Sequence, residues 1–209
     1  MIGRYPDYDV LESASRWDEA TRKVVETRMH RGSRALTFFD AAEEPTLRAL
    51  CDVLTAQDDE PRIPVAEMVD DALGLGRLDG YQYADMPDDR ECWRIVLRGL
   101  DEVARARYVA RDFAALDAEA REALIGQFAA GTLRGHSWEA LNVKRAFAVC
   151  MRAVLSAFYS HPWAWNEIGF GGPAYPQGYM RLGPLSVREP HEKRGATDED
   201  PVVFAGDES

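Results

Sequence analysis

The sequence has few of the residues that build covalent or metal-bound frameworks, with 3 cysteines and 4 histidines among its 209 residues. Cys51, Cys92 and Cys150 lie far apart, form no Cys-x-x-Cys pair, and each falls within an apolar helical pattern. This spacing is typical of reduced, buried thiols rather than of a disulfide framework. No Glu-x-x-His motif occurs, so a carboxylate-bridged dimetal bundle is excluded and no metal site is predicted.

Long apolar runs are also lacking. The longest nearly apolar run, residues 146–158, is interrupted by Arg152 and is too short to cross a bilayer, so no membrane insertion is expected. The first twenty residues have neither an apolar core nor a twin arginine, so no export signal is expected. We predict a cytoplasmic location, and the alternative is a periplasmic protein exported with a partner that carries the signal.

An excess of basic charge is absent as well. The chain has 25 basic and 36 acidic side chains and a net charge of −11, which argues against the basic face that nucleic-acid binding requires. Residues 41–91 alone hold fourteen acidic and four basic side chains. A solvated helical surface is one interpretation of this region, and a docking surface for a basic partner is another.

Familiar catalytic motifs are missing. The chain has no Gly-x-Ser-x-Gly, no Ser-x-x-Lys and no phosphate-binding glycine loop, so no catalytic residue is predicted. His161 is the candidate for a stand-alone enzyme, but a histidine that follows a helix is explained by its contacts with the last carbonyls. Acidic pairs such as Asp70–Asp71 are expected at helix ends or on the surface.

The patterns that are present indicate helices. No segment alternates with period two for long, whereas apolar residues recur every three or four positions. We predict an all-α, single-domain bundle of about six helices, near residues 10–31, 40–57, 64–74, 88–108, 117–130 and 137–158. Helix starts are indicated by a capping box of Asp40 and Glu43, by Asp88 or Asp89, by Asp117 and by Ser137.

The composition changes after His161. The stretch HPWAWNEIGFGGPAYPQGYMRLGPL, residues 161–185, mixes prolines and glycines with tryptophans and tyrosines. The prolines and glycines predict an irregular, non-helical segment. Because the segment is too aromatic for a solvated linker, we expect it to pack against another surface. The expected organisation is a peripheral N-terminal helix (1–37), a helical domain (38–185) and a polar tail (186–209).

Three stretches occur in a characteristic order. They are FFDAAEEPTLRALCDVLTAQD at 38–58, WRIVLRGLDEVARARY with FAALDAEAREALIGQF within 93–128, and FYSHPWAWNEIGFGGPAYPQGY at 158–179. Together they resemble the subunit 3 family of gluconate 2-dehydrogenase. The resemblance spans about residues 38–185 and rests on the order and spacing of the stretches rather than on one motif.

This resemblance implies a non-catalytic small subunit that holds no cofactor of its own. Such a subunit binds and stabilises a large FAD-dependent oxidoreductase of the glucose–methanol–choline type, which oxidises a sugar, sugar acid or glycoside. FAD is therefore expected in the partner, and a cytochrome c subunit is an optional further partner. An acidic helical scaffold for another protein, acting through residues 41–91, and a stand-alone enzyme are the alternatives.

The aromatic segment is the expected contact with that partner, because interface cores are enriched in aromatic residues. The predicted partner-binding residues are His161, Trp163, Trp165, Phe170, Tyr175 and Tyr179. The alternative is that these side chains cover the chain's own helices, and the sequence favours neither interpretation.

Overall fold

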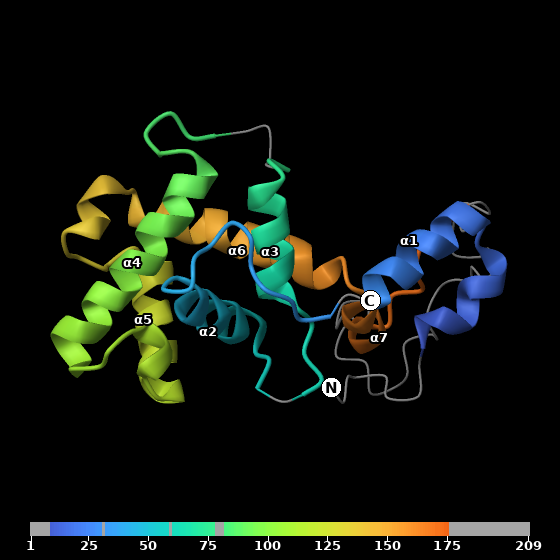
Figure 1. Ribbon diagram of the computed structural model, residues 1–209, viewed down its shortest axis with the longest axis horizontal. Coiled ribbons are helices and arrows are strands. Elements are labelled where there is room, and N and C mark those ends of the chain that lie inside the picture. Colours follow the sequence, from blue (N-terminus) through green and yellow to red (C-terminus); the bar gives the residue numbers. More distant parts are fainter. Residues whose placement is uncertain (1–8, 31, 59, 78–81, 176–209) are drawn as a thin grey trace, which may run out of the picture. The chain divides into compact units, whose positions relative to one another are not determined.

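The computed structural model describes residues 9–30, 32–58, 60–77 and 82–175. In these residues the chain forms seven α-helices and three 3₁₀ helices and no strand, which confirms the all-α prediction, with one α-helix more than expected (Figure 1). None of the helices in these ranges is both long and apolar enough to cross a membrane. The described residues divide into two compact units: a helical unit within residues 31–160, and a terminal unit that joins residues 9–30 with 161–175.

The helical unit is built around α6. Its elements are α2 (Glu44–Thr55), α3 (Val65–Gly74), α4 (Asp89–Tyr108), η2 (Phe113–Ala115), α5 (Ala118–Ala130), η3 (Ser137–Ala140) and α6 (Val143–Tyr159). Helix α6 packs against α2, α3, α4 and α5, so it carries much of the core of this unit (Figure 1). Trp93, Phe113 and Phe128 are among the largest side chains buried there.

Local signals set several helix ends as predicted. Asp88 accepts the N–H of Glu91 at 3.1 Å, and α5 ends at Gly131, whose φ of 72° is readily adopted by glycine. The capping box also forms: Asp40 accepts the N–H of Glu43 at 2.9 Å, and Glu43 accepts the N–H of Asp40 at 3.0 Å. These bonds hold a single turn, and regular helix α2 follows at Glu44.

The prediction that Ser137 caps the last long helix is wrong. Ser137 donates its hydroxyl and its N–H to Glu102, at 2.7 and 3.1 Å, and begins only the short η3. Helix α6 starts six residues later, where Asn142 accepts the N–H of Arg145 at 3.2 Å. The serine is therefore used in a contact between distant segments rather than as a cap, and that use is invisible in the local pattern.

The terminal unit contains η1 (Val10–Arg16), α1 (Glu19–Met29) and α7 (Pro162–Ile168). The helix expected over 10–31 is divided, because Asp18 accepts the N–H of Thr21 at 2.9 Å and starts α1 afresh. The prediction that residues 161–185 are not helical is wrong for α7. Proline is well tolerated at the first position of a helix, where its missing N–H leaves no bond unmade.

Candidate partner-binding site

The predicted partner-binding residues begin with His161, which starts α7 rather than ending a helix as expected. Its Nδ1 accepts the N–H of Trp163 at 3.2 Å, and its ring meets that of Trp163 edge-on with centroids 5.1 Å apart. The side chain is fully buried, at 0% exposure. A general base must reach the proton that it removes, so this placement favours a structural role for His161 over a catalytic one.

Trp165 anchors α7 to the N-terminal residues of the chain. It packs in a cluster with Val10, Trp17 and Val25, and all four side chains are buried. Beside this cluster, Val10 donates its backbone N–H to Oδ1 of Asn166 at 2.8 Å. The anchor therefore joins residues more than 150 positions apart in the sequence, and it gives Trp165 a place inside its own unit.

Three large apolar side chains that follow Trp165 are exposed to solvent. Ile168 is 50% exposed, Phe170 is 38% exposed and Tyr175 is 64% exposed. The ring of Phe170 also meets that of Trp165 edge-on, with centroids 5.6 Å apart, so its outward position rests on the buried anchor. Exposed apolar side chains gathered in one short segment are typical of interaction sites.

A glycine lets this exposed stretch run close to the anchor. Gly172 has a φ of +86°, and a Cβ built there would lie 2.8 Å from Trp17 and 2.9 Å from Val10. A side chain at this position would force the segment away from the cluster.

Five of the six predicted residues are described, and they differ in burial. His161 and Trp165 are buried, Trp163 is half-buried, and Phe170 and Tyr175 are exposed. Tyr179 lies outside the described residues. Ile168 was missed, because its exposure follows from the end of a helix that the sequence pattern did not predict.

Part of the acidic region 41–91 is internal rather than a solvated face. Asp70 is fully buried in α3, contrary to the expectation that the Asp70–Asp71 pair is terminal or exposed. Its carboxylate accepts the N–H groups of Phe38 and Phe39, at 2.8 and 3.0 Å, and the N–H and hydroxyl of Thr37, at 2.8 and 3.0 Å. Burial opposes ionisation, but the three backbone donors outweigh it and hold the pKa of Asp70 below its ordinary value.

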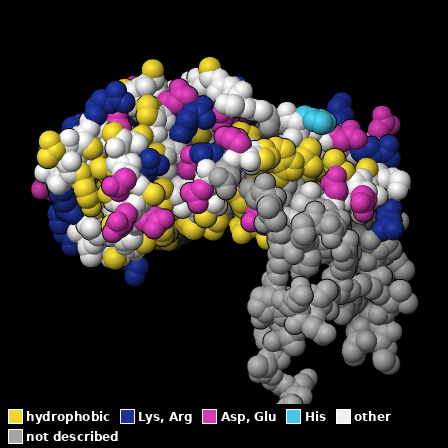
Figure 2. Space-filling model, turned by 90° about the horizontal axis from the view of Figure 1, so that it is seen from below, with side chains coloured by type: hydrophobic (Ala, Val, Ile, Leu, Met, Phe, Trp, Pro, Cys, Tyr) yellow, Lys and Arg dark blue, Asp and Glu magenta, His cyan; other side chains and the backbone are white. Residues whose placement is uncertain are grey.

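Glu67 is the second buried acid of this region, with 4% exposure. It accepts from Arg48 at 2.8 Å and from the hydroxyl of Ser33 at 2.9 Å. Burial again opposes ionisation, while Arg48, the backbone N–H of Glu67 itself and Ser33 together keep the pKa of Glu67 below its ordinary value. On the face of the helical unit seen in Figure 2, acidic side chains are interspersed with basic ones rather than forming one continuous acidic area.

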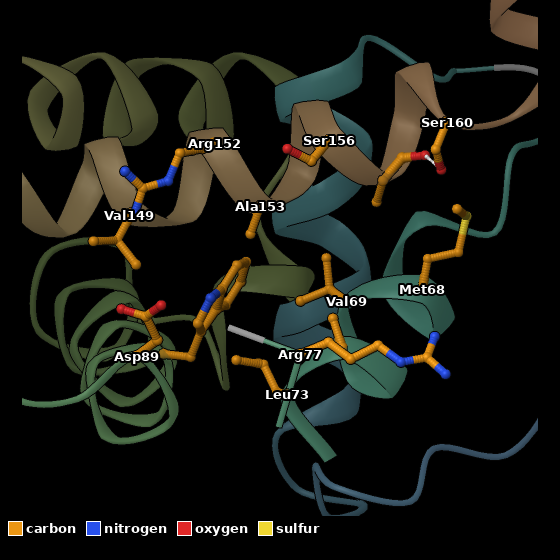
Figure 3. Close-up of a pocket in the computed structure, with 13 residues that line it drawn as sticks. Met68, Val69, Leu73, Arg77, Asp89, Val149, Arg152, Ala153, Ser156 and Ser160 are labelled. Atoms are coloured by element: carbon orange, nitrogen blue, oxygen red, sulfur yellow. Dashed lines mark hydrogen bonds between the residues drawn. The ribbon is translucent and has the colours of Figure 1, made fainter. Parts of the chain in front are cut away.

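The helical unit also holds a cavity of about 240 Å³ between α3, α4 and α6 (Figure 3). Its apolar lining includes Val69 and Leu73 from α3, Trp93 from α4, and Val149 and Ala153 from α6. Arg77, Asp89, Arg152 and Ser156 supply its polar edges. No sequence motif marks this cavity, because its walls come from three separate helices.

The three cysteines are free thiols buried in the helical unit, as predicted. Burial raises the pKa of the Cys92 thiol to about 12, and it raises the pKa of Cys51 and Cys150 as well. Helix packing brings Cys150 near the other two thiols, although the three lie far apart in the sequence. Within the described ranges, no group of histidine, cysteine and acidic side chains has an arrangement that could hold a metal ion.

Taken together, the described residues define an all-helical protein in which a short aromatic segment is anchored at one end and exposed at the other. The family described as gluconate 2-dehydrogenase subunit 3 matches residues 41–172, and the chain belongs to this family. The matched region runs from the turn before α2 to the glycine beside the tryptophan anchor. Searches of curated proteins and of solved structures gave no match.

Proposed function

We propose that this chain is the non-catalytic small subunit of a complex, in which it binds and stabilises a large FAD-dependent oxidoreductase of the glucose–methanol–choline type. The large subunit would hold the FAD and oxidise a sugar, a sugar acid or a glycoside, and a cytochrome c subunit would be an optional electron acceptor. Membership of the subunit 3 family supports the role of an accessory subunit. The choice of contact surface rests on one observation: Ile168, Phe170 and Tyr175 are exposed, while Trp165 of the same segment is buried and holds it in place.

Two opposing free-energy terms determine whether this surface can bind a partner: the burial of apolar area and the loss of conformational freedom. Exposed aromatic side chains lose their contact with water when a partner covers them, at roughly 25 cal/mol per Å² of apolar area. The anchor of Trp165 and the bond from Val10 to Asn166 hold the start of the segment in place before binding. Less conformational freedom is then lost on association, so more of the burial remains as affinity.

The two alternatives find less support. A stand-alone enzyme would need His161 to reach a substrate, but its side chain is fully buried and its Nδ1 is engaged by Trp163. A docking surface made by the acidic region would be without two of its charges, because Asp70 and Glu67 lie inside and hold loops.

Co-expression with a flavoprotein encoded beside this chain tests the proposal. We expect the large subunit to be unstable or poor in flavin when it is produced alone, and to gain flavin absorbance and dehydrogenase activity with the small subunit. Full flavin loading and activity of the large subunit by itself would contradict the proposal. Turnover by the isolated small subunit that His161→Ala removes would favour the enzyme instead.

A matched pair of variants tests the surface. Phe170→Asp places a charge in the exposed segment, and Tyr108→Asp places one at an aromatic of equal exposure, 38%, at the end of α4. We expect only Phe170→Asp to weaken co-purification by tenfold or more, which corresponds to about 1.4 kcal/mol. Equal retention of the partner by both variants would refute this choice of surface.

A further inference from the structure

We propose that the cavity between α3, α4 and α6 is a binding site for a small amphipathic carboxylate, with an apolar body in the cavity and its acid group at Arg77. The site is formed by other residues than those of the aromatic segment, and its occupant does not depend on the proposed partner. Figure 3 shows the residues that form it.

The walls select an apolar body. Val69 and Leu73 come from α3, and Val149 and Ala153 come from α6, so aliphatic groups face one another across the cavity (Figure 3). A volume of about 240 Å³ corresponds to about eight water molecules at their liquid volume, which suits a ligand of about eight to ten non-hydrogen atoms. Pockets that bind small molecules share this character, with a mostly apolar lining and a few polar groups.

The polar residues at the edges of the cavity favour a negatively charged group on the ligand and determine where it binds. Arg152 and Asp89 lie on one side of the cavity and Arg77 lies on the other (Figure 3). A carboxylate beside Asp89 would be repelled, whereas Arg77 makes no ion pair or side-chain hydrogen bond with any residue that the structure describes. A guanidinium is well suited to a carboxylate, which it can bind through two parallel hydrogen bonds.

Trp93 supplies an independent observation. Its side chain lines the cavity and is fully buried, yet its indole N–H has no acceptor in the described part of the chain. Buried donors without a partner are rare and costly in folded proteins. The indole belongs to the cavity wall, so its N–H resonance is a direct reporter of occupancy.

Octanoate is the probe for the test, because it has ten non-hydrogen atoms and one carboxylate. Titration into the full chain, followed by the ¹⁵N–¹H resonance of the Trp93 indole, is expected to give a saturable shift with a Kd on the order of 0.1–1 mM. Arg77→Gln should weaken binding about tenfold, because it removes the charge-assisted bonds. Arg98→Gln removes an exposed arginine of α4 outside the cavity lining and should leave the Kd unchanged.

Two further experiments test the contributions of the carboxylate and of the apolar cavity to binding. Octanol keeps the chain but lacks the charge, so it should bind at least tenfold more weakly than octanoate. Ala153→Phe should abolish the shift by filling the cavity, and Ala72→Leu on the opposite wall provides a milder block if the first variant unfolds. The proposal is overturned if octanoate gives no saturable shift, if octanol binds equally well, if a folded blocking variant still binds, or if Arg98→Gln weakens binding as much as Arg77→Gln.

Discussion

Asp70→Asn is a sharp test of how the helical unit is held together. The substitution keeps the shape of the side chain but replaces one carboxylate oxygen with an NH₂ group and removes the charge. Oδ1 accepts the N–H groups of Phe38 and Phe39, and Oδ2 accepts the N–H and hydroxyl of Thr37. Whichever way the amide turns, it presents a donor to a backbone donor and leaves at least one buried N–H group without an acceptor.

The expected loss follows from these bonds. A hydrogen bond to a charged group contributes about 1.5–3 kcal/mol, and a buried group left without a partner costs about 1–3 kcal/mol. With at least one backbone bond lost and the remaining ones no longer charge-assisted, we expect Asp70→Asn to lower the free energy of unfolding by about 3–5 kcal/mol. This is a large share of the roughly 5–15 kcal/mol that stabilises a typical domain.

Urea denaturation followed by far-ultraviolet circular dichroism measures this loss. Asp71→Asn is the matched control, because Asp71 is the next residue of α3 and shares the partly exposed Arg34 with Asp70, whose Oδ2 lies 3.3 Å from that guanidinium. Exposed pairs contribute about 0–1 kcal/mol, so the control should change stability by no more than that. A loss below about 1 kcal/mol for Asp70→Asn, or an equal loss for both variants, would refute the role given to the buried carboxylate.

The same carboxylate makes stability depend on pH in a defined direction. The pKa of Asp70 is lower in the folded chain than in the unfolded chain, because the backbone donors of residues 37–39 favour the ionised form against the opposing effect of burial. The stability that it contributes is therefore present above the unfolded value of about 3.9 and is lost as pH falls through the folded value. The gap between the wild-type chain and Asp70→Asn should be constant from neutral pH to about pH 4 and should narrow below it.

Two further predictions concern packing in the helical unit. Gly99→Ala should destabilise the chain by about 1–3 kcal/mol, because the new Cβ would lie 2.6 Å from the ring of Trp138, whereas Gly126→Ala in the open interior of α5 should stabilise it by about 0.5–1 kcal/mol. Denaturation curves of both variants decide this, and destabilisation by Gly126→Ala would contradict it. The three buried thiols should react with a disulfide reagent at pH 8 only after denaturant is added, because burial raises their pKa, and rapid labelling of the native chain would show that they are accessible.

Local sequence signals predicted the helical fold well because they act within a few residues. The caps at Asp88 and Asp117 and the capping box of Asp40 and Glu43 each involve a side chain and a backbone N–H no more than three positions away. The family was also identified from the order of three stretches, and the match over residues 41–172 confirms it. For the candidate site, the sequence located the aromatic segment but not which of its residues are exposed.

The sequence lacks a disulfide framework, long apolar runs and alternating strand patterns, and its apolar residues recur at helical spacing. Together these features determined that the chain is all-α and that its cysteines are reduced. Only the tertiary structure decided what individual residues do when their partners are distant in the chain. Asp70 became an internal anchor because residues 37–39 return to α3, and Trp165 became a core residue because Val10 and Trp17 pack on it. The cavity near Arg77 exists because three helices meet there, and no short-range pattern records such a meeting.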